Sequence, residues 1–213
     1  HPAHTKDLHH RYDKWVRSIL TAWRVQLQHQ DELAYAEIRE AQFRGAFDDL
    51  LTTCEDLEDT TEFLDGLLKE VYWYFGQITQ RVVNSATGKE ISEGEWDKSP
   101  GWIVIGGNKL DRGFTVKNLA ITYMPRGQGV GNADTLQQRG RFFGYKRTYL
   151  DLLRGWFTYD VARSFRSYVT HEVAMHKELV LIDKENTSLK SWRRRFLLDP
   201  SMKLTRKQVI SLD

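Results

Sequence analysis

The chain has 213 residues, of which 40% are hydrophobic and 28% are charged, and its formal net charge is +2. This composition allows one sizeable core plus an accessory region, and the single cysteine, Cys54, excludes a disulfide framework. No apolar run approaches the roughly 20 residues of a membrane span and no signal peptide is visible, so we expect a cytoplasmic protein without membrane contact. The sequence opens on His1-Pro2 rather than on methionine, which suggests a fragment of a longer protein.

The first 75 residues are predicted to be helical. Apolar residues recur at three- and four-residue steps over 8–27 and again over 33–51, which is typical of helices with one apolar face. A third helix is predicted over 60–74. We expect residues 1–75 to form a helical insertion or accessory region. The apolar stripe of the first helix consists of Leu8, Tyr12, Trp15, Val16, Ile19, Trp23 and Leu27.

The middle of the chain alternates short apolar runs with polar turns. The β-branched run Trp102 to Ile105 suits a strand that is buried on both faces of a parallel sheet. Gly106 and Gly107 then end the strand and allow the backbone to approach a ligand closely. Residues 90–100 are predicted to be a polar loop and a possible domain boundary. Strands are predicted over 78–84, 102–105, 119–124 and 150–157, followed by a long helix over 160–182 that Asp160 would cap.

Polar residues follow the second predicted strand in a specific order. Asp111, Arg112, Gly113 and Thr115 come a few residues after Gly107. In open α/β sheets a ligand binds beyond the carboxyl ends of the strands, where these residues would lie. The sequence therefore predicts a ligand site at this edge.

A second polar motif, 137–145, contains two arginines around a glycine. On a helix, Arg139 and Arg141 diverge by about 200°, so only one of them would face a given partner. A guanidinium group suits a phosphate whose negative charge grows in a transition state. The alternative interpretation is a solvated basic helix end.

Together these motifs resemble the second RecA-like domain of superfamily-two helicases and related DNA translocases. In that resemblance Asp111-Arg112-Gly113 corresponds to motif V, and the run from Gln137 to Arg141 corresponds to motif VI. It implies that Arg141, with Arg139 as second candidate, contacts the γ-phosphate of ATP and that Gln137 orients the nucleotide or water. Gly107 and the motif V residues would bind the nucleotide or couple it to DNA. The sequence departs from the pattern at Gly144, where the superfamily usually has an arginine.

The stretches 106–115 and 139–145 are more similar still to the Z-one domain family. That family has been described as an endonuclease and is found joined to superfamily-two ATPase modules in bacterial restriction-like and phage-defence proteins. The resemblance implies an α/β fold with a RecA-like parallel sheet, flanked by helices, over 76–160 and a basic, mainly helical extension over 161–213. It also implies ATP and Mg²⁺ as cofactors and, as partners, DNA, an N-terminal RecA-like domain of the same protein and other defence-system subunits.

The sequence lacks the phosphate-binding loop of a complete ATPase. No G-x-x-x-x-G-K-[ST] occurs, and Gly88-Lys89 is followed by Glu90. Nothing in the chain would cradle the β- and γ-phosphates or hold magnesium. We therefore expect no ATP hydrolysis by the chain alone, and an upstream RecA-like domain would supply the other half of the site.

A metal-dependent nuclease finds little support in the residues. No lysine follows an acidic residue by two positions, and the histidines are scattered. His171 and His176 are five residues apart, which separates their rings by about 140° on a helix and prevents them from sharing one metal ion. No metal site is predicted. A metal-dependent endonuclease and a non-catalytic module for DNA binding or partner docking stay as alternatives.

Charge is unevenly distributed along the chain. Between residues 31 and 70 there are 13 acids and three bases, whereas between 139 and 207 there are 16 bases and seven acids. A basic surface attracts phosphate backbones independently of base sequence; the alternative is a solvated face that balances the acidic helices. Four aromatic residues of this half are predicted to be core residues, with stacking on unpaired bases as the alternative; they are Trp156, Tyr168, Trp192 and Phe196. The predicted DNA contacts are Thr115, Lys146, Arg147, Arg193, Arg194 and Arg195.

Overall fold

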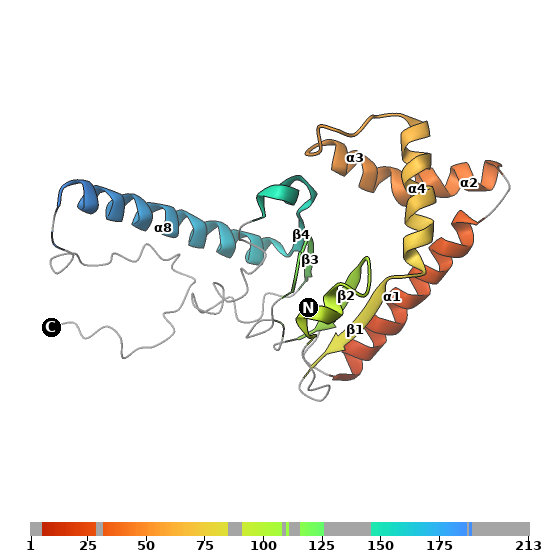
Figure 1. Ribbon diagram of the computed structural model, residues 1–213, viewed down its shortest axis with the longest axis horizontal. Coiled ribbons are helices and arrows are strands. Elements are labelled where there is room, and N and C mark those ends of the chain that lie inside the picture. Colours follow the sequence, from red (N-terminus) through yellow and green to blue (C-terminus); the bar gives the residue numbers. More distant parts are fainter. Residues whose placement is uncertain are drawn as a thin grey trace. The chain divides into compact units, whose positions relative to one another are not determined.

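The computed structural model describes residues 6–28, 32–84, 91–107, 110, 116–125, 146–186 and 188 (Figure 1). The chain forms two compact units. The first comprises His1–Thr122 and Tyr145–Arg154, and the second comprises Tyr123–Gly144 and Gly155–Asp213. No helix in the described part of the chain is both long and apolar enough to span a membrane.

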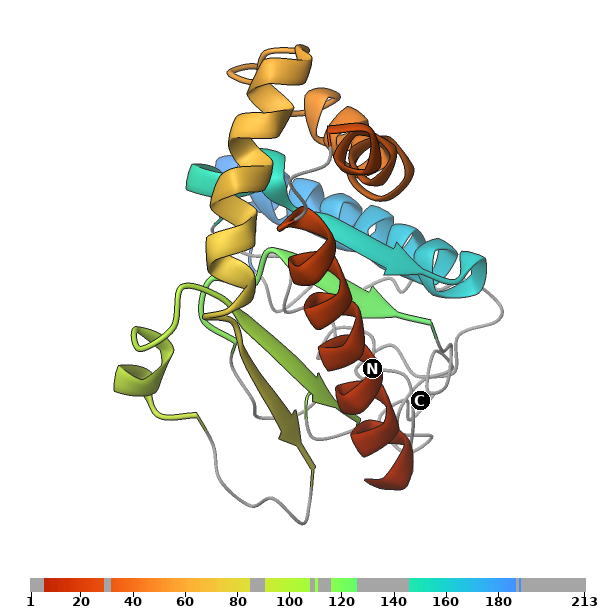
Figure 2. The same cartoon turned by 90° about the vertical axis from the view of Figure 1, so that its right-hand side faces the viewer.

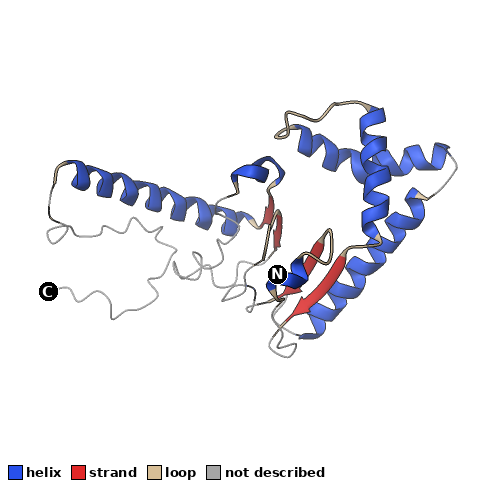
Figure 3. Ribbon diagram, viewed as in Figure 1, coloured by secondary structure: helices blue, strands red, loops and turns tan. Residues whose placement is uncertain are grey.

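The first unit begins with the three predicted helical segments, drawn in blue in Figure 3. The helix α1 spans Lys6–Leu27, and α4 spans Thr61–Phe75. Thr60 caps α4, because its hydroxyl accepts a hydrogen bond of 3.2 Å from the Phe63 N–H. The predicted second helix is interrupted: α2 (Glu32–Ile38) and α3 (Gly45–Leu51) are joined by the π-helical segment η1 (Arg39–Arg44).

These helices bury one apolar cluster. Leu27 from α1, Phe47 from α3, and Leu64 and Leu68 from α4 are its buried members. Each such side chain contributes about 1.5–3 kcal/mol when it is fully buried. Trp23 extends the cluster, with its ring centroid 5.8 Å from that of Phe75. Of the predicted stripe on α1, Leu27 is therefore buried in the core of this helical region, whereas Trp15 is 60% exposed.

The first sheet follows directly from α4. Its strands β1 (Thr79–Val83) and β2 (Trp102–Gly106) are parallel, with a register that runs from Thr79 opposite Trp102 to Val83 opposite Gly106 (Figure 2). Both strands were predicted from the sequence, and they are confirmed. In the described residues the strands form two two-stranded sheets, β1–β2 and β3–β4.

The prediction of a loop over 90–100 is wrong in part, because this stretch contains the short helix α5 (Glu93–Trp96). Ser92 and Glu95 form a capping box, and Trp96 is buried against Val83. The Trp102 indole donates a hydrogen bond of 3.0 Å to the Trp96 carbonyl oxygen. The S-x-x-E pattern was the sequence signal for this helix.

The second sheet pairs β3 (Ile121–Met124) with β4 (Arg154–Phe157). The predicted strand 150–157 was too long, because Arg147–Leu152 is a 3₁₀ helix. Leu150 and Leu152 are exposed there, so they do not contribute the buried side chains that the sequence pattern favoured.

The second unit is organised around the long helix α8 (Tyr159–Lys184). Thr158 is the residue before its first turn and Asp160 lies within that turn, so the prediction of Asp160 as the cap is wrong. Val161 and Phe165 bury a core with Met124, and Phe157 and Tyr168 pack against it, as predicted for Tyr168. Trp156, which was also predicted to be core, is 50% exposed.

Arg154 ties the end of α3 to the start of β4 within the first unit. Its side chain is only 13% exposed and forms an ion pair with the Asp49 carboxylate. The guanidinium also donates to the Asp49 carbonyl oxygen at 2.9 Å, to the Thr53 hydroxyl at 2.7 Å and to the Asp151 carbonyl oxygen at 2.7 Å. Several acceptors thus compensate the cost of burying this charge.

We expect Arg154→Met to lower the free energy of unfolding by about 2–4 kcal/mol, because charge-assisted hydrogen bonds are lost together. Urea unfolding followed by circular dichroism measures the change. Arg11→Met on the exposed side of α1 is the matched control and should change stability by no more than about 0.5 kcal/mol. Equal effects of the two substitutions would contradict the role of Arg154.

A second prediction concerns Glu95. The Ser92 backbone N–H, the Ser92 hydroxyl and the Arg81 guanidinium donate to its carboxylate and lower its pKa from 4.5 to about 2. The stabilisation is therefore fully present above about pH 4.5 and is lost as the pH falls through about 2. The difference in unfolding free energy between the wild type and Glu95→Gln should be constant near neutral pH and shrink across this interval. If the difference in unfolding free energy does not change with pH, the lowered pKa of Glu95 is refuted.

Candidate functional site

The carboxyl edge of the β1–β2 sheet is the candidate site. Because Val83 lies opposite Gly106, the next residues, Asn84 and Gly107, reach the same edge of the parallel pair. Both are buried, and Asn84 is only 5% exposed. The Leu110 N–H donates to the Gly107 carbonyl oxygen at 2.9 Å, so the chain turns directly after the strand. This is where open α/β sheets bind ligands.

Gly106 makes this arrangement possible. A Cβ atom at Gly106 would collide with the Val83 carbonyl oxygen and would lie 2.8 Å from Leu110 Cγ. Neither neighbour is a freely moving side-chain end, because one is strand backbone and the other belongs to the apolar cluster around Val83. The absence of a side chain lets the two strand ends and the following turn pack closely.

The structure describes three of the predicted site residues, Gly107, Lys146 and Arg147. Gly107 lies at the sheet edge beside Asn84, a residue that the sequence had placed at the end of the first strand. The predictions for the remaining site residues stay predictions, since these residues lie outside the described part of the chain. They are Asp111, Arg112, Gly113, Thr115, Gln137, Arg139, Arg141, Arg193, Arg194 and Arg195.

Lys146, a predicted DNA contact, is only 8% exposed. Its ammonium group donates to the Leu119 carbonyl oxygen and lies 5.6 Å from the centre of the Tyr149 ring. Burial lowers the pKa of Lys146. In this position the ammonium group holds the chain before β3 and is not offered to a phosphate. Arg147, the next residue, is exposed at the start of the 3₁₀ helix.

Arg154 also belongs to the basic half of the sequence and is likewise engaged within the protein. Its carboxylate partner, Asp49, is 105 residues away in the sequence. No local pattern identifies such a partner, so the sequence alone shows Arg154 only as one of the 16 bases between 139 and 207. Other cations of this half, among them Arg163 and Arg166 on α8, are exposed.

No metal centre is evident in the described residues, where no group of three or more histidine, cysteine, aspartate or glutamate side chains is arranged to hold an ion. His171 and His176 both lie in α8, the first buried and the second exposed. Cys54 is buried, with its thiol directed at the Asp151 carbonyl oxygen at 3.7 Å. Among the described residues, the site at the sheet edge offers the glycine backbone of 106–107 and the Asn84 amide.

Comparison with known proteins identifies a family. The family model described as the Z1 domain matches residues 1–198 of the chain. The search of curated proteins and the search of solved structures found no significant match to the chain.

We expect Gly106→Ala to destabilise the fold by about 1–3 kcal/mol, because its methyl group would force β1 and β2 apart. Gly66→Ala in α4 is the control: nothing lies within 4 Å of the added carbon, and a helix interior gains about 0.5–1 kcal/mol from the change. Thermal unfolding of both variants measures the contrast. If Gly106→Ala is as stable as the wild type, the close approach at this edge is not required.

Proposed function

We propose that this chain, which belongs to the Z1 domain family, is the C-terminal motor half of a superfamily-two-type DNA helicase or translocase in a bacterial restriction-like or phage-defence protein. In this proposal its sheet is the C-terminal RecA-like sheet. ATP and Mg²⁺ bind between it and a second RecA-like domain, which carries the phosphate-binding loop.

The observation that carries the proposal is the parallel register of β1 and β2. It brings Asn84 and the Gly106-Gly107 pair to one carboxyl edge. The segment with Asp111, Arg112 and Gly113 begins only four residues after Gly107. A nucleotide bound beyond this edge is therefore within reach of the motif V segment.

For ATP hydrolysis this domain has to supply positive charge at the γ-phosphate and to orient the nucleotide or the attacking water. Phosphoryl transfer to water spreads negative charge over the γ-phosphate oxygens, and a guanidinium group stabilises that charge. Arg141 supplies it, with Arg139 as the second candidate, and Gln137 orients the nucleotide or the attacking water. Asp111-Arg112-Gly113 couples the ATP site to DNA.

In this proposal DNA is contacted by Arg147, which is exposed, and by Thr115 and residues 193–195, which lie outside the described part of the chain. Lys146 has a different role, because its ammonium group is hydrogen-bonded to the Leu119 carbonyl oxygen. It holds the chain directly after the motif VI segment beside the start of β3. Lys146 is therefore a positioning residue in the proposed motor.

We expect Arg141→Ala in the full-length protein to lower the kcat of DNA-stimulated ATP hydrolysis by about 10³–10⁵-fold, the usual contribution of an arginine finger. Arg11→Ala, on the exposed surface of α1, is the control and should leave turnover unchanged. Intact turnover in Arg141→Ala would remove the finger assignment.

The isolated chain provides the second arm of this test. It should not hydrolyse ATP, and robust turnover by it would overturn the half-site proposal. Magnesium-dependent nicking of a plasmid by the isolated chain would instead identify an endonuclease. If substitution of the arginines weakens DNA binding by the full-length protein but leaves its ATPase activity unchanged, the chain is a non-catalytic module.

A further inference from the structure

One face of α8 collects positive charge. Arg163, Arg166, Lys177 and Lys184 are all exposed, and at 3.6 residues per turn they fall within a sector of about 60°. These four residues are called the basic stripe. The acidic residues of the helix lie about 100° or more from the centre of the stripe; they are Asp160, Glu172, Glu178 and Asp183.

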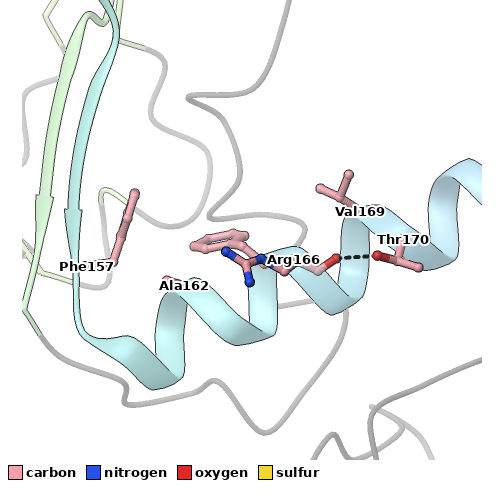
Figure 4. A pocket seen from close by; sticks show the side chains of 6 residues that line it. Phe157, Ala162, Arg166, Val169 and Thr170 are labelled. Carbon is pink, nitrogen blue, oxygen red and sulfur yellow. Dashed lines mark hydrogen bonds between the residues drawn. The ribbon is translucent and has the colours of Figure 1, made fainter. Parts of the chain in front are cut away.

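A shallow apolar pocket of about 350 Å³ opens beside the stripe (Figure 4). Arg166 belongs to both, and Phe157 reaches the pocket from β4. The hydroxyl of Thr170 donates to the Arg166 carbonyl oxygen at 3.0 Å and so presents little polar surface of its own. The lining residues are Phe157, Ala162, Phe165, Arg166, Val169 and Thr170.

Two further aromatic side chains are exposed where β4 meets α8. Tyr159 is 80% exposed and shares the sector of the stripe, and Trp156 is 50% exposed. Aromatic faces next to guanidinium groups are the combination by which proteins bind unpaired bases and their phosphates without sequence preference.

We propose that the basic stripe, with Tyr159 and the pocket at Arg166, is a track for single-stranded nucleic acid. The pocket takes one unpaired base, whose flat face meets the apolar wall, while Arg163 and Arg166 contact the neighbouring phosphates. A paired base has no free face to enter, so the track selects single strands over duplex.

The dimensions of the helix fit this assignment. From Tyr159 to Lys184 the helix extends about 38 Å at 1.5 Å per residue. A strand along it spans several nucleotides, within the roughly 4–16 nucleotides of other single-strand sites. The inference rests on the proposed function only for the choice of DNA as the polymer.

The first experiment measures the stripe. Binding of the 213-residue chain to a fluorescent oligothymidine is followed by anisotropy at several salt concentrations. In Arg163→Gln/Arg166→Gln the slope of log Kobs against log salt should become shallower by about 1.4, because each phosphate contact to a single strand contributes about 0.7. Affinity at low salt should fall at least about tenfold.

The matched control is Arg11→Gln/Lys14→Gln, which removes two exposed cations with the same spacing from α1. It should leave both the slope and the affinity unchanged. An unchanged slope in the stripe variant, or an equal loss in the control, would overturn the track.

The second experiment measures the pocket. An oligothymidine with one 2-aminopurine should change its emission when the base stacks in the pocket. Ala162→Leu fills the pocket at an exposed helix position and should abolish this change and weaken binding about tenfold, with the salt slope retained. Ala46→Leu on the exposed side of α3 should bind as the wild type does.

Duplex of the same length that binds as tightly as the single strand, with silent 2-aminopurine, would refute the base pocket. The two proposals fail separately. Loss of single-strand binding in the stripe variant while Arg141→Ala keeps full ATP turnover supports the track and removes the assignment of Arg141 as the arginine finger. The reverse result removes the track and supports the motor.

Discussion

At Gly106 the backbone of β2 passes so close to the Val83 carbonyl oxygen that no side chain fits between them. This contact fixes the last paired position of the parallel sheet, and the two residues that follow, Asn84 and Gly107, share its carboxyl edge for that reason. Val83 also belongs to the buried cluster with Ile91 and Trp96, which packs around this contact. Within the described residues, the carboxyl edge that we propose for the nucleotide is thus formed by the close packing of β1 and β2.

The cations that the structure describes in the basic half of the chain form two groups with different surroundings. Lys146 is buried and Arg154 is mostly buried. Each is hydrogen-bonded to backbone oxygens or to a carboxylate, and the two residues flank the 3₁₀ helix on either side. Buried charges of this kind hold segments in place, because removing one leaves its partners unsatisfied. Exposed cations such as Arg163 and Arg166 are not held by burial in this way, and in the proposed track they are the group that meets the polyanion.

Helix positions could be predicted from the sequence because apolar periodicity is a local property, and α1 and α4 follow it closely. A local signal also explains α5, because its S-x-x-E capping box is present in the sequence, although the polar composition of 90–100 favoured a loop. The 3₁₀ helix could not be foreseen, because exposed Leu150 and Leu152 imitate a strand. The Arg154–Asp49 pair is set by tertiary packing alone, and the motif V and VI residues lie outside the described part of the chain.

The net charge of the whole chain, +2, is a poor measure of the local positive charge that one face of α8 would present to a polyanion. At physiological salt the Debye length is about 8 Å, so acids farther away than this hardly weaken the field above an exposed cation. What matters is the distribution on one helix face, where the basic stripe is aligned and the acids of α8 point elsewhere. Of the 13 acidic residues between 31 and 70, Asp48, Asp49, Asp59 and Asp65 pair with arginines of the first unit. A nearly neutral chain is therefore compatible with both acidic helices and the proposed nucleic-acid track.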